Sequence, residues 1–257
     1  MVKLLKQGIT MFKKLLRKDF VLCVALGANV NSADEWLKYA DKEMRGDQSR
    51  AQMVMTIKTP NWTRTLEIES DVDGKGKALS TIKSPAKEKG IRTLRLEQNM
   101  WNYFPKLKRK VAVSSSMLLA SWMGSDFTND DVLKASSMSD DYKHSFIKDK
   151  TFNGESLKGI ENTAKENTKA MWPKIITYAS KKDCLPRVYQ YYNKEGELKR
   201  TLSFSDIKTF DGHKIPTHWE MSPEEDKDKK TIIDYKSINF SPKFNADHFS
   251  QKSLTGN

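Results

Sequence analysis

The stretch Leu66–Gly76, LEIESDVDGKG, alternates apolar and acidic side chains and then enters a glycine-rich turn. Side chains of a strand point alternately to its two faces, so Leu66, Ile68 and Val72 would share one face and the acids the other. Asp73-Gly74-Lys75-Gly76 is typical of a tight hairpin turn. The stretch therefore predicts an antiparallel hairpin with one buried face and one solvated face.

The same alternation continues on both sides of this hairpin. Asn193–Gly196 and Asp211-Gly212 separate further alternating runs, and Glu224–Lys230 is a charged turn. The sequence has no internal repeat and no Pro/Gly/Ser linker, so we expect a single domain with one antiparallel sheet of about ten or eleven strands. Apolar positions of these runs are Met53, Met55, Ile57, Leu94, Leu96, Leu202, Phe204, Ile215, Trp219, Met221, Ile232, Ile238 and Phe240.

Two segments have helical signals. Residues 34–44 begin with two acids, which favour the positive end of a helix, and then repeat apolar residues near helical spacing. Thr128 and Asp131 have the spacing of a capping box, so we expect a short helix over residues 129–135. Gly124 supplies the bend that precedes this helix.

One sheet with one apolar face and only two helices leaves much apolar surface to bury. The sheet must curl, and the helices must cover its concave side. The interior of such an incomplete barrel can be larger than the side chains that fill it, which leaves an apolar cavity. Methionine suits the wall of such a cavity because it repacks around varied guests. The candidates are Met53, Met55, Met100, Met117, Met123, Met171 and Met221.

The N-terminal segment has the features of a secretory signal peptide. A basic cluster over residues 13–18 precedes the apolar run Phe20–Val30, and small residues follow up to Ala33. We expect cleavage of residues 1–33 to leave a domain over residues 34–257, and the true start is possible at Met11 as well as at Met1. The alternatives are a buried N-terminal helix and a lipid anchor at Cys23. After cleavage Cys184 would be a lone thiol, which we expect to be buried.

Composition and charge exclude several classes of protein. The 257 residues are 37% hydrophobic and 30% charged, with a mean hydropathy of −0.69, and no apolar run is long enough to span a membrane. The net charge is +12, and it falls to about +7 when residues 1–33 are removed, leaving 39 basic and 32 acidic residues. The basic residues are spread along the chain, so we expect no nucleic-acid partner and only weak attraction to an anionic membrane surface.

Catalytic and metal-binding patterns are not found in the sequence. His213 and His218 are five residues apart, so on one strand they would point to opposite faces. We see no nucleophile elbow, phosphate loop or paired carboxylates. We therefore expect a protein that is not an enzyme and that uses no cofactor and no metal.

Two motifs resemble those of a known family. Met100–Arg109, MWNYFPKLKR, followed by Met123–Phe127, MGSDF, and Asp131, is similar to the outer-membrane lipoprotein-sorting family. These are the LolA-like periplasmic carriers, in the branch often found with RND-type exporters, and the resemblance covers roughly residues 33–254. It implies a half-open barrel with helices as a lid over an apolar cavity that holds lipid acyl chains.

The candidate site combines the apolar strand faces with the approach to the second helix. For the aromatic residues Trp101, Tyr103 and Phe104 the alternatives are that two of them line the mouth of the cavity and that they are ordinary core. For Gly124, Ser125 and Asp126 the alternatives are a hinge for the lid and a static turn. The candidates for the ligand cavity are Met53, Met55, Leu66, Ile68, Leu94, Leu96, Trp101, Tyr103, Met117, Trp122, Met123, Phe127, Trp219 and Met221.

The sequence thus predicts a monomeric periplasmic chaperone-like carrier that ferries a lipoprotein or a free lipid between the inner and outer membranes. The expected partners are acyl chains, an inner-membrane RND-type exporter and an outer-membrane acceptor. The alternative is an envelope-stress sensor that uses the same fold to detect mislocalised lipid. Such a sensor would be expected to carry a second domain, and residues 139–257 instead continue the same strand pattern.

Overall fold

The segments with period-two alternation form strands in the computed structural model, which describes residues 31–134, 138–166, 168 and 170–255. Thirteen strands pair into a single antiparallel sheet. The strands are β1 (Gln48–Lys58), β2 (Thr63–Asp73), β3 (Lys77–Ser84), β4 (Arg92–Leu96), β5 (Asn99–Phe104), β6 (Arg109–Ala112), β7 (Tyr142–Phe152), β8 (Glu155–Ala164), β9 (Lys174–Ser180), β10 (Pro186–Tyr192), β11 (Leu198–Phe210), β12 (His213–Pro223) and β13 (Lys230–Asn239).

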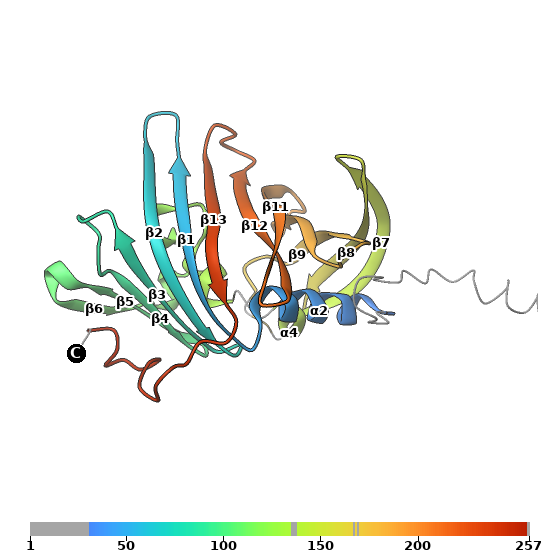
Figure 1. Ribbon diagram of the computed structural model, residues 1–257. Coiled ribbons are helices and arrows are strands. Elements are labelled where there is room, and N and C mark those ends of the chain that lie inside the picture. The colour runs from blue at the N-terminus through green and yellow to red at the C-terminus, as the bar shows by residue number, and fades with distance from the viewer. Residues whose placement is uncertain (1–30, 135–137, 167, 169, 256–257) are drawn as a thin grey trace, which may run out of the picture.

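The order of the strands explains the shape of the sheet. It runs β6-β5-β4-β3-β2-β1-β13-β12-β11-β10-β9-β8-β7, so every pair is a neighbour in sequence except β1 and β13 in the middle. The hairpin predicted at Asp73–Gly76 joins β2 to β3, with Asp73 opposite Lys77. Figure 1 shows the sheet curved into a trough, with β6 and β7 at opposite ends. The described residues of β6 and β7 do not pair with each other, so the sheet is an incomplete barrel, as expected.

The number of strands is higher than the ten or eleven that the sequence indicates. β7 and β8 account for part of the difference, because much of β7 is exposed on both faces and shows no alternation. β6 has only four residues, and a short 3-10 turn at Pro105–Leu107 separates it from β5. Strands without one clean buried face do not give the period-two signal.

The first predicted helix is confirmed as α2 (Ala33–Arg45). Ser32 and Glu35 form a capping box at its start, and Asp34 and Glu35 lie in its first turn. Trp36 is fully buried and its Nε1 donates to the carbonyl oxygen of Cys184 at 2.9 Å. Residues 1–30 of the predicted signal peptide lie outside the described residues, and a cut after Ser32 or Ala33 would separate α2 from its cap.

Cys184 is fully buried, as expected. Its sulfur is disulfide-bonded in this structure. The expectation of a lone thiol concerns the chain after cleavage of residues 1–33, and it stays a prediction.

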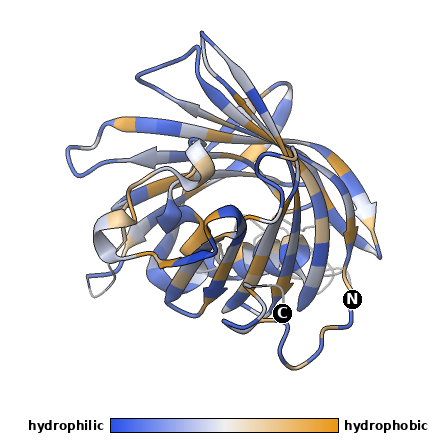
Figure 2. Ribbon diagram, turned by 90° about the vertical axis from the view of Figure 1, so that its left-hand side faces the viewer, coloured by the Kyte–Doolittle hydropathy of each residue, from blue (hydrophilic) through white to orange (hydrophobic). Residues whose placement is uncertain are grey.

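The chain crosses the hollow of the sheet between β6 and β7. This crossing segment (residues 113–134) contains two 3-10 turns and α3 (Asn129–Leu133), which has the capping box predicted at Thr128 and Asp131. α3 is shorter than predicted, the expected end at Ala135 lies outside the described residues, and α4 (Met138–Asp141) follows. Figure 2, viewed from the β6 side, shows the strands curving around turns of the chain that lie inside the hollow.

The convex side of β3 to β5 is covered as well. Leu79 and Leu94 pack there against Leu254 near the C-terminus, with Leu96, Trp101 and Tyr103 around them. Arg92 donates to the carbonyl oxygen of Ser253 at 2.6 Å and fixes the C-terminal segment on this face. This part of the sheet is therefore buried on both sides.

The pairing between β12 and β13 is unusually short. Only His218–Met221 of β12 pair with β13, although β12 pairs along its whole length with β11. α2 meets the unpaired edge, where the Lys214 amide donates to Glu43 Oε1 at 2.6 Å. None of the described helices has the length and apolar character needed to cross a membrane.

Candidate functional site

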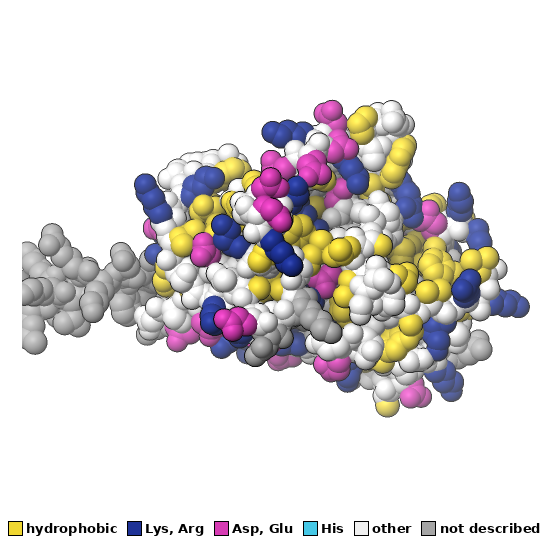
Figure 3. Space-filling model, turned by 180° about the vertical axis from the view of Figure 1, so that it is seen from behind, with side chains coloured by type: hydrophobic (Ala, Val, Ile, Leu, Met, Phe, Trp, Pro, Cys, Tyr) yellow, Lys and Arg dark blue, Asp and Glu magenta, His cyan; other side chains and the backbone are white. Residues whose placement is uncertain are grey.

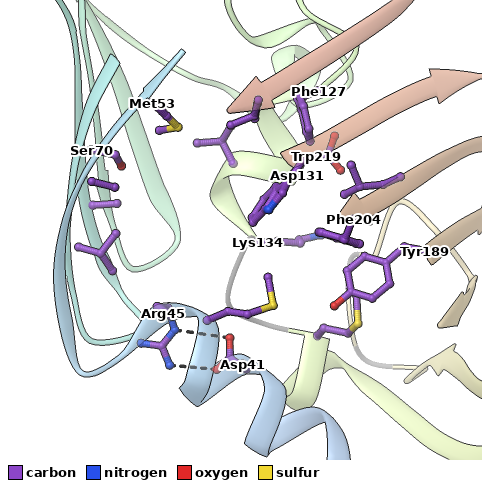
Figure 4. Close-up of a pocket in the computed structure, with 18 of the residues that line it drawn as sticks. Asp41, Arg45, Met53, Ser70, Phe127, Asp131, Lys134, Tyr189, Phe204 and Trp219 are labelled. Carbon is purple, nitrogen blue, oxygen red and sulfur yellow. Dashed lines mark hydrogen bonds and ion pairs between the residues drawn. The ribbon is translucent and has the colours of Figure 1, made fainter. Parts of the chain in front are cut away.

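A cavity of about 370 Å³ lies between the curved sheet, α2 and the crossing segment. Its wall on the β1–β2 side carries Met53, Met55 and Ile68, which share one strand face through the alternation. On the opposite side the wall comes from β9 to β13. Figure 4 shows Met53 facing Phe204 and Trp219 across the hollow. The cavity therefore takes residues from both halves of the chain.

The wall on the side of β10 to β13 is a continuous series of aromatic rings. Tyr191, Tyr189, Phe204, Trp219 and Tyr235 follow one another across four strands, with centroids of successive rings 4.9–6.4 Å apart. Tilted and edge-to-face contacts of this kind add stability beyond the area that they bury. Burial raises the pKa of Tyr235 to about 12 and also raises the pKa of Tyr189 and Tyr191, so all three phenols stay neutral at physiological pH.

The crossing segment is tied to both sides of the trough. On one side Trp122 Nε1 donates to Thr93 Oγ1 at 3.1 Å, and Arg64 donates to the carbonyl oxygen of Met123 at 2.9 Å. On the other side Thr231 Oγ1 donates to Asp126 at 2.7 Å. Gly124 has a φ of 72°, which suits glycine at this bend.

Arg200 adds the strongest link between the crossing segment and the sheet. Its guanidinium donates to both carboxylate oxygens of Asp131 and to the carbonyl oxygen of Asp126. The same group lies over the rings of Trp172 and Tyr191, at 4.5 and 4.4 Å from their centroids. A hinge at Gly124, Ser125 and Asp126 would have to break several of these contacts.

One end of the cavity is polar. Asp41 and Arg45 of α2 form an ion pair at 2.9 Å, and Lys134 pairs with Asp130 at 3.0 Å. Arg95 of β4 is buried and donates to the carbonyl oxygens of Leu133 and Lys75. Burial lowers the pKa of Arg95, and the nearby charge of Arg45 lowers it further. Burial likewise raises the pKa of Asp130. Figure 4 shows Asp41 and Arg45 at the α2 end of the cavity.

The structure brings some of the predicted cavity residues together. Of the candidates from the sequence, the cavity lining includes Met53, Met55, Ile68, Trp122, Phe127 and Trp219. Leu66 and Met221 are fully buried in the core that supports the lining. Met123 packs against that core, and Met117 contributes its carbonyl oxygen to Asn129 Nδ2 at 2.9 Å.

The remaining candidates lie on the other side of the sheet. Leu94, Leu96, Trp101 and Tyr103 pack on the convex face against the C-terminal segment, away from the cavity. Their neighbours Thr93 and Arg95 take the concave positions, because side chains alternate. The apolar pattern of β4 and β5 therefore marks the face that the C-terminal segment covers.

Sequence reasoning missed the polar end and part of the aromatic wall. Tyr189 and Tyr191 alternate with Val188 and Gln190, so the period-two pattern could have placed them on one face. No sequence signal marks Arg45 and Arg95 as neighbours, because they come from a helix and a strand that only the tertiary fold brings together.

Within the described residues, no group of three or more His, Cys, Asp or Glu side chains has a placement that could hold a metal ion. His213 stacks on Phe240 with ring centroids 4.2 Å apart, and His218 contacts Asp234 at 2.7 Å. On the face seen in Figure 3, lysines and arginines are interspersed with acids and apolar side chains. That mixture differs from the continuous basic patch of a nucleic-acid-binding surface.

An unclosed antiparallel sheet, a chain segment held in its hollow and an apolar cavity between them define a LolA-like half-barrel. The chain belongs to a protein family described as "uncharacterized protein", whose model matches residues 74–256. No curated protein sequence matches the chain significantly.

Three solved structures share this fold. A domain described as an outer membrane lipoprotein-sorting protein, from Vibrio parahaemolyticus, is 23% identical with a TM-score of 0.76, covering 87% of this chain and 98% of that one. A DUF1329 family protein from Desulfovibrio piger is 22% identical with a TM-score of 0.80, covering 86% and 97%. The LolA superfamily protein NE2245 from Nitrosomonas europaea is 17% identical with a TM-score of 0.74, covering 87% and 100%.

Proposed function

We propose that this protein is a periplasmic carrier that binds lipid acyl chains, of a lipoprotein or of a free lipid, in the cavity of the half-barrel. The observation that carries the proposal is the cavity of about 370 Å³ with methionine, isoleucine and aromatic walls. Its volume falls within the range of small-molecule sites. The fold shared with a protein described as lipoprotein-sorting supports the same class of ligand.

The physical need for such a cavity is large. Each methylene group exposed to water costs about 0.8 kcal/mol, so a 16-carbon chain costs on the order of 10 kcal/mol. A carrier must recover much of this free energy and still release its ligand. Rings and thioethers provide contact without directional bonds, which suits binding that is both broad and reversible.

The cavity supports binding better than catalysis. Each of its three carboxylates, Asp41, Asp130 and Asp131, is paired with a cation. A general acid or base needs a group that is poised to give up or take a proton in the site. In the proposed role the protein receives acyl chains at the inner membrane, from a partner such as an RND-type exporter, and passes them to an acceptor at the outer membrane.

The first test is native mass spectrometry of the mature protein purified from its own periplasm, with extraction of any lipid that accompanies it. We expect a co-purifying lipid or acylated peptide. A clean unliganded mass, together with no uptake of the neutral fluorophore N-phenyl-1-naphthylamine, would mean that the apolar wall serves only as core.

A matched pair of variants locates the binding. Ser70 lines the cavity and Glu67 is exposed on the same strand. Ser70→Trp should fill the hollow and weaken uptake of the fluorophore at least tenfold, whereas Glu67→Trp should leave uptake unchanged. Equal uptake by both variants would place the bound fluorophore elsewhere on the protein.

A further inference from the structure

The polar end of the cavity is built from charged groups that the binding of an acyl chain alone does not require. Three cations and three carboxylates of the described residues line the cavity: Arg45, Arg95 and Lys134 with Asp41, Asp130 and Asp131. Arg200, which is not part of the lining, pairs with Asp131. Burying charges beside an apolar wall costs free energy. If this part of the cavity were only structural, apolar side chains would stabilise the fold better than charged ones.

Arg45 has N–H groups that make no hydrogen bond with the described residues. Its guanidinium carries five N–H groups. Three of them make hydrogen bonds, two to the carboxylate of Asp41 and one to the carbonyl oxygen of Gly46. The remaining two N–H groups have no acceptor among the described residues, and the side chain lines the cavity.

Arg95 makes this end more favourable to an anion. Both side chains line the cavity. Burial is the main cause of the lowered pKa of Arg95, and the positive charge of Arg45 lowers this pKa further. A negative charge placed between the two guanidinium groups would offset the repulsion of their positive charges, and guanidinium groups bind carboxylate and phosphate oxygens in a bidentate manner.

Tyr189 supplies a neutral donor beside these cations. Its hydroxyl group points into the cavity (Figure 4) and makes no hydrogen bond with any described residue. Asp41 is near enough to raise the pKa of this phenol further, after burial, so the hydroxyl and the ion pair of α2 lie on the same side of the cavity.

We infer that the ligand is an anionic amphiphile, whose carboxylate or phosphate group is bound by Arg45 and the Tyr189 hydroxyl while its chain lies along the Met53 and Phe204 walls. This assignment rests on the proposed function, because it takes the apolar cavity as the acyl-chain site. It adds a chemical class to the ligand, which an apolar wall alone would leave open.

The test compares three competitors that carry the same 16-carbon monounsaturated chain. Palmitoleate has a carboxylate, the corresponding lysophosphatidylglycerol has a phosphate, and the monoacylglycerol is neutral. Each competitor is titrated into protein loaded with N-phenyl-1-naphthylamine, and the loss of fluorescence measures displacement from the cavity. We expect the better anionic competitor to bind about tenfold or more tightly than the neutral one, which is the effect of one charge-assisted hydrogen-bond pair. Whichever anion binds more tightly identifies the head group.

Two variants of the ion pair should act in opposite directions. Arg45→Gln should remove the preference for the anion, so that anionic and neutral lipids of the same chain length bind equally. Asp41→Asn should strengthen binding of the anion severalfold, because it frees two more donors of Arg45. The matched control is Arg50→Gln, which makes the same change of charge in an ion pair with Asp71 outside the cavity lining.

The outcomes separate the two proposals. Equal binding of anionic and neutral lipids by the wild type and by both variants would overturn the anionic head group and leave the acyl-chain cavity in place. Failure of the fluorophore and all three lipids to bind would overturn both. If Arg45→Gln unfolds, the gain expected for Asp41→Asn still decides the matter, because a loss of anion binding in that variant would contradict the assignment.

Discussion

At the scale of single residues, Asp130 shows how the charged end of the cavity affects stability. Burial raises the pKa of its carboxyl group, so the folded protein keeps this proton at pH values where the unfolded chain has lost it. The folded state is thus favoured at low pH, and this contribution is lost as the pH rises from about 3.8 through the raised folded pKa. The ion pair with Lys134 at 3.0 Å offsets only part of the cost of burial.

Asp130→Asn keeps the shape of the side chain and removes its charge. We expect the variant to have a larger free energy of unfolding than the wild type at neutral pH, with the difference shrinking towards zero in acid. Urea unfolding over a series of pH values measures this. Asp140→Asn is the control, and its effect on stability should have the opposite dependence on pH. The hydrogen bond from Lys75 lowers the pKa of Asp140, so the stability that this carboxylate contributes is lost as the pH falls. A uniform loss of stability in Asp130→Asn at every pH would contradict the prediction.

Residue identity alone could not place the side chains of β4. The alternation of Leu94 and Leu96 with Arg95 is plain in the sequence, and apolar side chains normally face the interior. Here the C-terminal segment covers the convex face, so the leucines point to it and Arg95 lies against the cavity. The pattern gives the two faces correctly, but a contact with residues more than 150 positions away decides which face lines the hollow.

At the scale of elements, the crossing segment decides whether the cavity has a hinge at Gly124. The backbone amide of Trp122 donates to Phe127 at 2.7 Å, and that of Ser125 donates to Trp122 at 3.0 Å. We expect these two amides to exchange hydrogen as slowly as those of the neighbouring strands. Exchange as fast as at an exposed hairpin tip such as Gly196 would instead support the hinge.

Gly124→Ala measures how much the conformation of this turn contributes to the stability of the protein. The glycine has a φ of 72°, and an added Cβ would lie 3.3 Å from Arg64 Nη1. We expect the variant to lose more than the ~1–2 kcal/mol that a left-handed alanine costs, because the contact with Arg64 is also disturbed. Gly154→Ala is the matched control, with a φ of 77° and open space around its Cβ. Thermal unfolding of both variants gives the comparison, and equal losses would mean that the contact with Arg64 has little effect.

Elements with clear local signals were the ones predicted well from the sequence. The β2–β3 hairpin and α2 follow from an alternating run with a glycine turn and from a helix with acids at its start. β7 could not be predicted this way, because it is an edge strand that buries neither face consistently. The 3-10 turn at Trp122–Gly124 was equally hidden, since tertiary hydrogen bonds with Arg64 and Thr93 hold it in place.

At the scale of the whole molecule, the open sheet has two edges, β6 and β7, that pair on one side only among the described residues and that must not pair with other copies. β7 is the longer of the two and carries Lys143, Lys148 and Lys150, all exposed, with an irregular register beside them. Charged side chains and bulges are the usual means of blocking association between sheet edges. The monomeric state stays a prediction, and the edge lysines offer a way to test it.

Replacing these three lysines by threonine should therefore cause self-association. Sedimentation velocity would show the wild type as a monomer and the triple variant as dimers or larger species at the same concentration. The control replaces Lys87, Lys89 and Lys194, which are exposed in turns, and so removes the same charge without touching an edge. Association of both variants would attribute the effect to net charge.

The pairing of β1 with β13 has a consequence for the stage of folding at which the cavity forms. Each half of the chain is a meander of hairpins between sequence neighbours, whereas Met55 and Ile233 must meet from opposite ends of the domain. Contacts of such long separation form late in folding. The two walls of the cavity belong to different halves, so the hollow does not exist until this seam closes. If the protein carries lipid as proposed, only completely folded molecules would accept it, and a bound lipid would in turn hold the seam shut.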